Sequence, residues 1–217
     1  MQDEKRAAGR WFDRRAGAYE GGFTARWRDP VQQGSFDAIA LTGTDRLLDV
    51  GCGTGAASRK AAALARSVVG VDLSSEMLRE AGELARAIDN VTFMQADAEA
   101  LPFADGSFTA VLCTNSFHHY PNPANTLREM SRVLSPAGRL VVGDPCADVW
   151  TVRVADVFLK RMEPGHIRLY RSDEMASFLY GAGLTDVRVR KLIDGAMTIY
   201  AGRNPARRAT DERPPEG

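Results

Sequence analysis

Short apolar runs alternate along this chain with longer stretches in which apolar residues recur every three or four positions. The short runs predict five buried strands, at residues 47–50, 68–72, 91–95, 107–113 and 139–144. The longer stretches predict helices, at residues 56–66, 78–88, 125–134 and 173–181. This alternation is typical of an α/β protein whose sheet is mostly parallel.

The last part of the chain predicts a hairpin instead of another strand–helix unit. Residues 185–192 alternate apolar and charged side chains, as a strand with one wet face does. Asp194-Gly195 is a hairpin turn signal, and residues 196–201 predict the returning strand. We therefore expect one antiparallel partner at the edge of the parallel sheet.

The segments outside this alternation set the predicted limits of the domain. Residues 1–9 are polar, and we expect them to be disordered. Phe12, Ala16 and Tyr19 then follow at i, i+4 and i+7, which predicts a short helical cap. The charged, Pro-rich residues 203–217 predict a disordered tail, so that residues 10–202 form a single domain.

Two connecting segments are less regular. Residues 23–45 predict a further helix and a turn before the first strand. Residues 145–171 break the alternation of strands and helices, and residues 152–161 predict a helix within them.

Three glycines, Gly51, Gly53 and Gly55, separate the first strand from an Ala-rich helix. Glycine permits positive φ and close approach of a ligand to the backbone. Gly51-x-Gly53-x-x-Ala56, with Asp72 about 20 residues further on, satisfies the loose dinucleotide-binding pattern. Because NAD and S-adenosylmethionine (SAM) both present a ribose diol to Asp72, this spacing leaves both cofactors open.

Asp49 shifts the prediction towards SAM. It lies two residues before the first glycine, at the end of a strand. A carboxylate that faces the ligand there repels a pyrophosphate and favours a positive charge, such as an amino group or a sulfonium.

Residues 47–55 (LLDVGCGTG) resemble the first motif of class I SAM-dependent methyltransferases. Further matches to this family lie in the Phe-Asp-x-x-Ala-x-x-Tyr segment, in a loop DAEALPF, in a His-His loop and in RVLSPAG, at residues 12–19, 97–103, 114–123 and 132–138. The resemblance covers about residues 10–202 and is strongest to the small-molecule branch, which includes quinone-ring C-methyltransferases. It implies a Rossmann-like, seven-stranded sheet with one antiparallel strand and helices on both faces. Thr109 departs from the family, which usually has aspartate there.

The resemblance also implies roles in the cofactor site. Tyr19 is expected near the methionine moiety, and Met77 against the adenine. Asp97 would accept a hydrogen bond from the adenine amino group and the Ala98 N–H would serve the ring; an NAD site needs no acid there. The expected cofactor-binding residues are Tyr19, Asp49, Gly51, Cys52, Gly53, Gly55, Asp72, Leu73, Met77, Asp97, Ala98 and Asn115.

Methyl transfer from a sulfonium is an in-line SN2 displacement, so the enzyme mainly aligns the reactants and excludes water. A general base helps when the acceptor is a phenol, a hydroxyl or an acidic carbon. His118 and His119 are the candidates, and at most one of two adjacent side chains faces the pocket; alternatively, both only shape the loop. The expected substrate-binding residues are Phe117, His118, Tyr120, Trp150 and His166.

Charge and cysteine content exclude other classes of function. Lys+Arg and Asp+Glu both number 28, so no overall basic field attracts nucleic acid or an anionic membrane, although a zero sum leaves a local basic patch open. The three cysteines lack a C-x-x-C spacing, which argues against a disulfide framework or a metal site and for the cytoplasm. No secretory signal and no apolar run long enough to span a membrane is found.

The leading prediction is a SAM-dependent methyltransferase whose partner is a small-molecule methyl acceptor, with no nucleic acid partner and with a homodimer as a further candidate. Two alternatives stay open from the sequence. One is an NAD-dependent oxidoreductase, which Asp49 and Asp97 disfavour. The other is a non-catalytic SAM-binding module.

Overall fold

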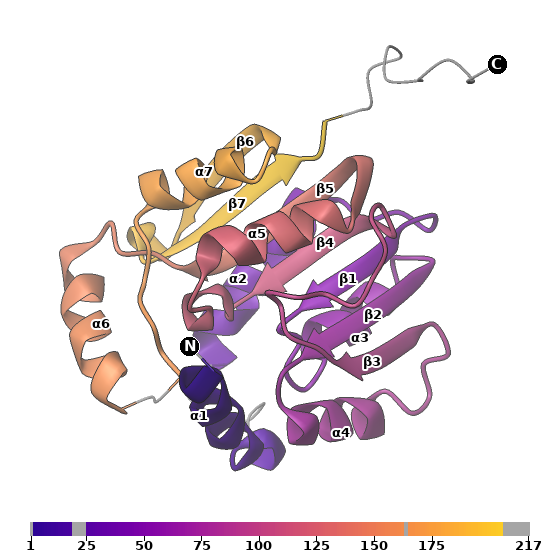
Figure 1. Ribbon diagram of the computed structural model, residues 1–217, viewed down its shortest axis with the longest axis horizontal. Helices are drawn as coiled ribbons and strands as arrows, with labels where there is room; N and C mark the ends of the chain where they lie inside the picture. The colour runs from indigo at the N-terminus through magenta and orange to yellow at the C-terminus, as the bar shows by residue number, and fades with distance from the viewer. Residues whose placement is uncertain (1, 19–24, 163–164, 206–217) are drawn as a thin grey trace.

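The computed structural model describes residues 2–18, 25–162 and 165–205, and its centre is a seven-stranded sheet (Figure 1). The strands are β1 (Arg46–Val50), β2 (Ser67–Asp72), β3 (Val91–Gln95), β4 (Phe108–Thr114), β5 (Leu134–Pro145), β6 (Thr185–Leu192) and β7 (Met197–Arg203). Their order across the sheet is β3-β2-β1-β4-β5-β7-β6. Every pair is parallel except those of β7, which runs antiparallel to β5 and to β6. The predicted fold class is confirmed.

Helices cover both faces of this sheet, and Figure 1 shows α5 in front of it and α2 behind it. The helices are α1 (Gln2–Asp13), α2 (Ala25–Ile39), α3 (Ala56–Ala62), α4 (Ser75–Leu84), α5 (Pro123–Arg132), α6 (Trp150–Met162) and α7 (Ser172–Gly181), with short 3₁₀ turns at η1 (Ala16–Ala18), η2 (Phe117–His119) and η3 (Ile193–Gly195). Within the described ranges, none of these helices has the length and apolar content needed to cross a bilayer.

The central strands are buried on both faces, which explains their nearly continuous apolar sequences. In β1, Leu48 and Val50 belong to the same core cluster as Leu127 of α5. Leu47 points the other way and belongs to a second cluster with Ile39 of α2. The alternation of side chains along a strand therefore places Asp49 on the same face as Leu47.

The N-terminal part of the chain differs from its prediction. Residues 2–9 are helical, because α1 begins at Gln2, so the expected disorder there is wrong. Ala8, near the end of this segment, is 9% exposed. The helix expected through residues 12–19 ends at Asp13, and η1 follows it. Tyr19 lies outside the described residues.

The fold also continues slightly past the predicted C-terminal boundary at residue 202. Strand β7 reaches Arg203. The side-chain amide of Asn204 donates to the Leu134 carbonyl (2.6 Å), and its backbone N–H donates to the Gly138 carbonyl (3.0 Å). Residues 206–217 of the predicted tail lie outside the described part of the chain.

A buried carboxylate, Asp45, joins the strands at the amino edge of the sheet, just before β1. Its side chain accepts hydrogen bonds from the Thr109 hydroxyl (2.7 Å), the Thr42 N–H (2.7 Å) and the Thr42 hydroxyl (2.9 Å). Arg139 of β5 makes an ion pair with it at 2.6 Å. Burial raises the pKa of Asp45, but these hydrogen bonds outweigh it and the pKa lies below the ordinary value. Thr109, the departure from the family pattern, thus has a structural partner in this chain.

Candidate active site

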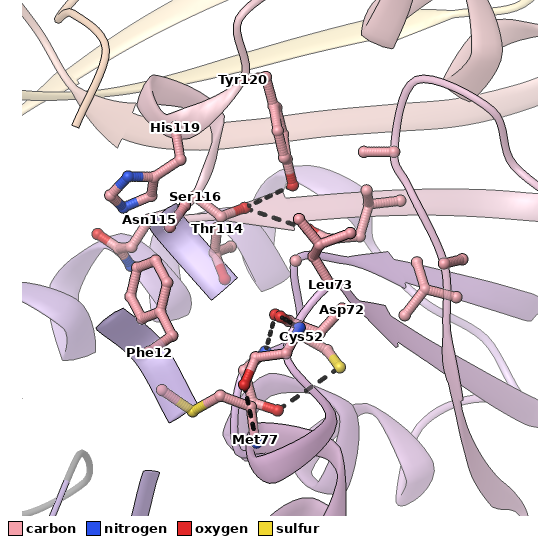
Figure 2. Close-up of a pocket in the computed structure, with 18 of the residues that line it drawn as sticks. Phe12, Cys52, Asp72, Leu73, Met77, Thr114, Asn115, Ser116, His119 and Tyr120 are labelled. Atoms are coloured by element: carbon pink, nitrogen blue, oxygen red, sulfur yellow. Dashed lines mark hydrogen bonds between the residues drawn. The ribbon is translucent and has the colours of Figure 1, made fainter. Parts of the chain in front are cut away.

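The main cavity opens at the carboxyl edge of the sheet, above the ends of β1, β2, β3 and β4 (Figure 2). The chain leaves β1 for β2 and β3 on one side and returns to β4 on the other, so the cavity lies where the strand order reverses. Ligands of open α/β sheets bind at such a switch point. Ala8, Gly9 and Phe12 of α1 and Gln32 of α2 complete the wall.

The glycine turn after β1 forms the floor of this cavity, which Gly51, Cys52 and Gly53 line. The N–H groups of Gly51 and Cys52 both donate to the Val71 carbonyl, at 2.8 and 3.0 Å, and tie the turn to β2. Gly51 has φ +71°, and a Cβ there would lie 2.3 Å from the Ser116 Oγ. The backbone at Gly51 therefore has no room for a side chain, as the sequence predicted.

Gly55 has a different role from the one predicted. It is the N-cap of α3 with φ +78°, and a Cβ would lie 2.7 Å from the Phe93 ring. It does not line the cavity, unlike Thr54 before it and Ala56 after it. Helix packing and a left-handed backbone explain this glycine.

Asp72, at the end of β2, lines the cavity and holds the turn in shape. One carboxylate oxygen accepts the Gly53 N–H and the other accepts the Ser74 N–H, both at 2.9 Å. Each oxygen keeps a second lone pair, which suits the two hydroxyls of a ribose. Burial raises the pKa of Asp72 above its ordinary value, because its effect is larger than the opposite effect of these N–H donors.

The residues predicted to bind the adenine lie together on one wall of the cavity. Asp97 and Ala98 line the cavity beyond β3, and Leu73 and Met77 line it beyond β2. The Glu99 N–H donates to an Asp97 carboxylate oxygen at 2.9 Å and fixes the loop. Figure 2 shows Met77, Cys52 and Asp72 on the same side of the cavity.

Asp49 does not face the ligand mouth as predicted. It is 1% exposed, does not line the cavity, and accepts a hydrogen bond of 2.6 Å from the Ser58 hydroxyl of α3. The reason is its register: in β1 it shares the face of Leu47, which points towards α3. Burial, with a smaller contribution from the Asp72 carboxylate, raises the pKa of Asp49 to about 6. Its charge can therefore act on a ligand through the turn, but without a direct contact.

The opposite wall comes from the segment after β4, where Thr114, Asn115, Ser116, His119 and Tyr120 line the cavity. Asn115 has φ +53°, uncommon for a residue with a side chain, and its N–H donates to the Gly143 carbonyl at 2.8 Å. The Ser116 hydroxyl lies 3.1 Å from the Tyr120 hydroxyl and donates to the Val50 carbonyl at 3.2 Å. Figure 2 shows both hydroxyls directed towards the glycine turn, so Tyr120 reaches the cofactor side of the cavity.

The rings of the two adjacent histidines lie side by side in η2, with 4.0 Å between centroids, and of the two His119 lines the cavity. Its Nδ1–H donates to the Gly165 carbonyl at 2.8 Å, so Nε2 is the basic ring nitrogen. Its ring meets that of Phe12 edge to face, with 5.0 Å between centroids. Burial, then the neighbouring His118, lowers the pKa of His119 well below 6.5. His119 is therefore neutral at pH 7.

His118 is buried behind this wall and does not line the cavity. Its Nδ1 lies 3.0 Å from an oxygen of Asp144, which also accepts the His118 backbone N–H at 3.0 Å. These bonds orient the loop but keep His118 away from a substrate in the cavity. A direct general-base role for His118 does not fit this position.

In addition to His118, three predicted substrate contacts do not line the described cavity. Phe117 is fully buried in the core beneath η2. His166 is 5% exposed, and its Nε2 lies 2.6 Å from an Asp156 oxygen. Trp150 is 72% exposed at the start of α6, outside the cavity wall. Sequence reasoning missed Gln32 and Ala8, because nothing near them in the sequence signals that α1 and α2 reach the cavity.

The groups on the wall fit SAM better than a dinucleotide. The described lining residues include the acids Asp72 and Asp97 and no lysine or arginine, so a pyrophosphate would find no counter-charge. SAM carries a ribose and a positive charge. The tight turn at Gly51 lets the ligand approach the backbone, and the remaining lone pairs of Asp72 can accept hydrogen bonds from the ribose hydroxyls. No cluster of His, Cys, Asp or Glu in the described ranges could hold a metal ion.

Comparisons with known proteins agree with this geometry. Residues 48–142 match the family described as methyltransferase domain. The chain is 32% identical over 197 residues to a demethylmenaquinone methyltransferase of Clavibacter sepedonicus, covering 82% of this chain and 80% of that protein. It is 41% identical over 110 residues to the 27-O-demethylrifamycin SV methyltransferase of Amycolatopsis mediterranei, covering 49% and 40%.

Solved structures share the fold. Geranyl diphosphate C-methyltransferase from Streptomyces coelicolor, solved with S-adenosyl-L-homocysteine, superposes with a TM-score of 0.69 at 18% identity, over 83% of this chain and 80% of that one. The NAD-dependent alternative finds no support in these comparisons. With its glycine turn, its strand-end acids and these relatives, the chain belongs to the class I SAM-dependent methyltransferases.

Proposed function

We propose that this SAM-dependent methyltransferase acts on a neutral, largely apolar ring compound, and that His119 accepts the proton that the acceptor loses. Transfer of a methyl group from SAM to a small-molecule acceptor follows from the family. The nature of the acceptor and the roles of the residues are the proposal. Its central observation is a histidine, His119, on the wall of a cavity whose described lining residues include no lysine or arginine.

The cofactor half of the cavity is assigned from its hydrogen-bonding groups. Asp72 would hold the ribose, Asp97 and the Ala98 N–H the adenine, and the turn at Gly51 and Gly53 the methionine part. Bound SAM supplies a methyl group that its sulfonium has already activated. The protein then has to position the acceptor and keep water out.

The acceptor half is lined by Phe12, Gln32, Asn115 and His119. A phosphorylated or carboxylated acceptor would bury its charge there without a partner, which is unfavourable. Phe12 offers an aromatic surface, and Gln32 and Asn115 can hydrogen-bond to a carbonyl or a hydroxyl. The names of the two relatives, a demethylmenaquinone and a demethylrifamycin methyltransferase, fit such an acceptor.

His119 suits a base because its hydrogen bond to Gly165 fixes which nitrogen carries the proton. With Nδ1–H donated to that carbonyl, Nε2 is the nitrogen that can take a proton from a hydroxyl or an acidic carbon. Burial favours the neutral ring, which is the form that can accept a proton, and the proton taken up in one turnover is released before the next.

The test is methyl transfer from labelled SAM to a panel of neutral phenols and quinols, with carboxylated and phosphorylated analogues alongside. His119→Ala should lower kcat by about 10²–10⁴-fold, the usual contribution of a general base. The SAM dissociation constant, measured by calorimetry, should change less than about threefold. Tyr180→Ala, at a side chain 58% exposed on α7, is the control and should keep full activity.

Two outcomes would contradict the proposal. Label transfer to the charged analogues alone would exclude the neutral acceptor. An unchanged kcat in His119→Ala would exclude His119 as the general base. The homodimer and the cytoplasmic location expected from the sequence stay predictions, which light scattering and cell fractionation can test.

A further inference from the structure

Helix α6 exposes an apolar face to solvent. Trp150, Val154, Val157, Phe158 and Met162 are 49% to 76% exposed. Their spacing of i, i+4, i+7, i+8 and i+12 puts them on one side of the helix. None of the residues of α6 is buried, and Figure 1 shows the helix at the periphery, outside the layers that cover the sheet. Contiguous exposed apolar surface of this kind marks an interaction site.

The opposite side of α6 is fixed to the protein. Asp156 lies 2.6 Å from the His166 Nε2 and accepts the Leu169 N–H at 3.0 Å. Val152, four positions before Asp156 on the same side, is the other half-buried residue of the helix. Turning the apolar face inward would break these bonds to Asp156, so the apolar face points away from the body of the protein.

The charges of α6 indicate what covers this face. Arg153, Lys160 and Arg161 are all exposed, and Asp156, held by His166, is the only acid in the helix. Arg161, at i+11 from Trp150, lies within the apolar face itself. An apolar face with Trp and Phe, accompanied by cations, is the pattern of a helix that lies in a lipid interface.

We propose that α6 docks the protein on the surface of an anionic lipid bilayer, with its apolar side chains in the acyl boundary and its cations among the headgroups. A second copy of the chain is the less favourable occupant. Lys160 already pairs with Asp156 at 3.1 Å, and Arg153 donates to the Ala147 carbonyl at 2.7 Å. Arg161 lies within the apolar face, where α6 offers no acid, so two α6 helices packed face to face would bring their Arg161 side chains together, and like charges repel.

This docking helix is close to the cavity. The His166 ring, which lies against Asp156, is 5.2 Å from the His118 ring and 6.3 Å from the His119 ring, between centroids. His119 lines the cavity. Helix α6 and the His166 and His119 side chains would therefore separate a bilayer from the proposed acceptor half. The docking itself does not rest on the identity of the acceptor.

The test is flotation of the full chain with vesicles of phosphatidylcholine and phosphatidylglycerol in equal amounts, and with phosphatidylcholine alone. We expect binding to the anionic vesicles that weakens at 0.5 M salt. Phe158→Ser should reduce partitioning about tenfold, because one large apolar side chain leaves the bilayer. Arg161→Glu should reduce binding to the anionic vesicles by a similar factor. Leu84→Ser, at an exposed leucine of α4, is the matched control and should bind as the wild type does.

Circular dichroism and SAM calorimetry on each variant establish that it folds. The proposal is overturned if the wild type binds neither vesicle, or if it binds and the α6 variants bind equally well. A dimer in light scattering that Phe158→Ser dissociates would also overturn it, since a second copy would then cover the face. All these readouts are independent of methyl transfer, so an error in the proposed acceptor would leave them unchanged.

Discussion

Two buried aspartates stand at opposite ends of β1, and their environments differ in nearly every respect. Asp45, 4% exposed, receives hydrogen bonds from Thr42 and Thr109 and pairs with Arg139. Asp49, 1% exposed, accepts one side-chain hydrogen bond, from Ser58, and lies near the anionic Asp72. The pKa of Asp45 is lowered, whereas that of Asp49 is raised to about 6.

The contrast distinguishes a carboxylate that stabilises the fold, Asp45, from a carboxylate without a cationic partner among the described residues, Asp49. Asp45 has its compensating cation within the protein, at the amino edge of the sheet. The groups that act on Asp49, Ser58 and Asp72, include no cation, and Asp49 lies beneath the turn where a cationic cofactor would bind. A buried, uncompensated acid is destabilising by itself and is typical of functional sites.

The largest expected effect comes from removing the compensated acid. Asp45→Ala should destabilise the protein by about 3 kcal/mol, because it leaves the Arg139 guanidinium without its partner in a partly buried place. The free energy of unfolding in urea measures this. SAM affinity should change little, since the residue lies at the far edge of the sheet. Asp105→Ala, which breaks an ion pair with Arg132 at an aspartate 80% exposed, is the control, with an expected change within about 0.5 kcal/mol.

Asp49→Asn should raise the free energy of unfolding, whereas Asp45→Ala lowers it. A pKa raised from 3.8 to about 6 corresponds to a penalty of about 3 kcal/mol for burying the charge at pH 7.5. Burial of the polar amide offsets part of this gain, so the variant should be more stable by about 2 kcal/mol. The same change should weaken SAM binding in calorimetry. If the variant is less stable than the wild type at pH 7.5, the Asp49 carboxylate is compensated after all and the comparison fails.

The sign of the pH dependence follows from the raised pKa. Folded Asp49 keeps its proton up to about pH 6, whereas the unfolded side chain loses it near pH 4. Its contribution to stability is therefore fully present below pH 4 and is lost as the pH rises to about 6. The advantage of Asp49→Asn should accordingly shrink as the pH falls from 7.5 to 4.5, which parallel urea titrations would reveal.

The smallest expected effect is on cofactor affinity. Protonation of Asp49 removes the negative charge beneath the turn, so SAM should bind up to about tenfold more weakly at pH 5.0 than at pH 7.5. Titration of SAM itself also contributes to the measured difference in affinity. The Asp49→Asn variant keeps that contribution and lacks the Asp49 carboxylate, so the difference between the two proteins gives the effect of Asp49. Equal pH dependence in the wild type and in Asp49→Asn would show that Asp49 does not act on the cofactor.

Much of the fold and the cofactor side could be predicted because the signals are local. The apolar runs identify the strands, and Asp72 and Asp97 follow their strands directly in the sequence. The cavity residues on α1 and α2 could not be found this way, because only tertiary packing brings Ala8 and Gln32 to the glycine turn.

The errors at the acceptor side have the same origin. Which of His118 and His119 faces the cavity depends on Asp144, distant in sequence, which binds His118. Trp150 and Phe117 are aromatic and close to the expected mouth in sequence, yet one is exposed on α6 and the other is buried in the core. The direction of Asp49 depends on register alone: one residue along β1 reverses the face.

The uncompensated charge of Asp49 also bears on turnover. Loss of the methyl group turns the sulfonium of the donor into a neutral thioether. If SAM binds at the turn as proposed, Asp49 would attract the sulfonium of the donor and would have no such attraction for the thioether of the product. The electrostatic difference favours exchange of product for fresh donor, so the same buried acid that makes the empty enzyme less stable would limit product inhibition.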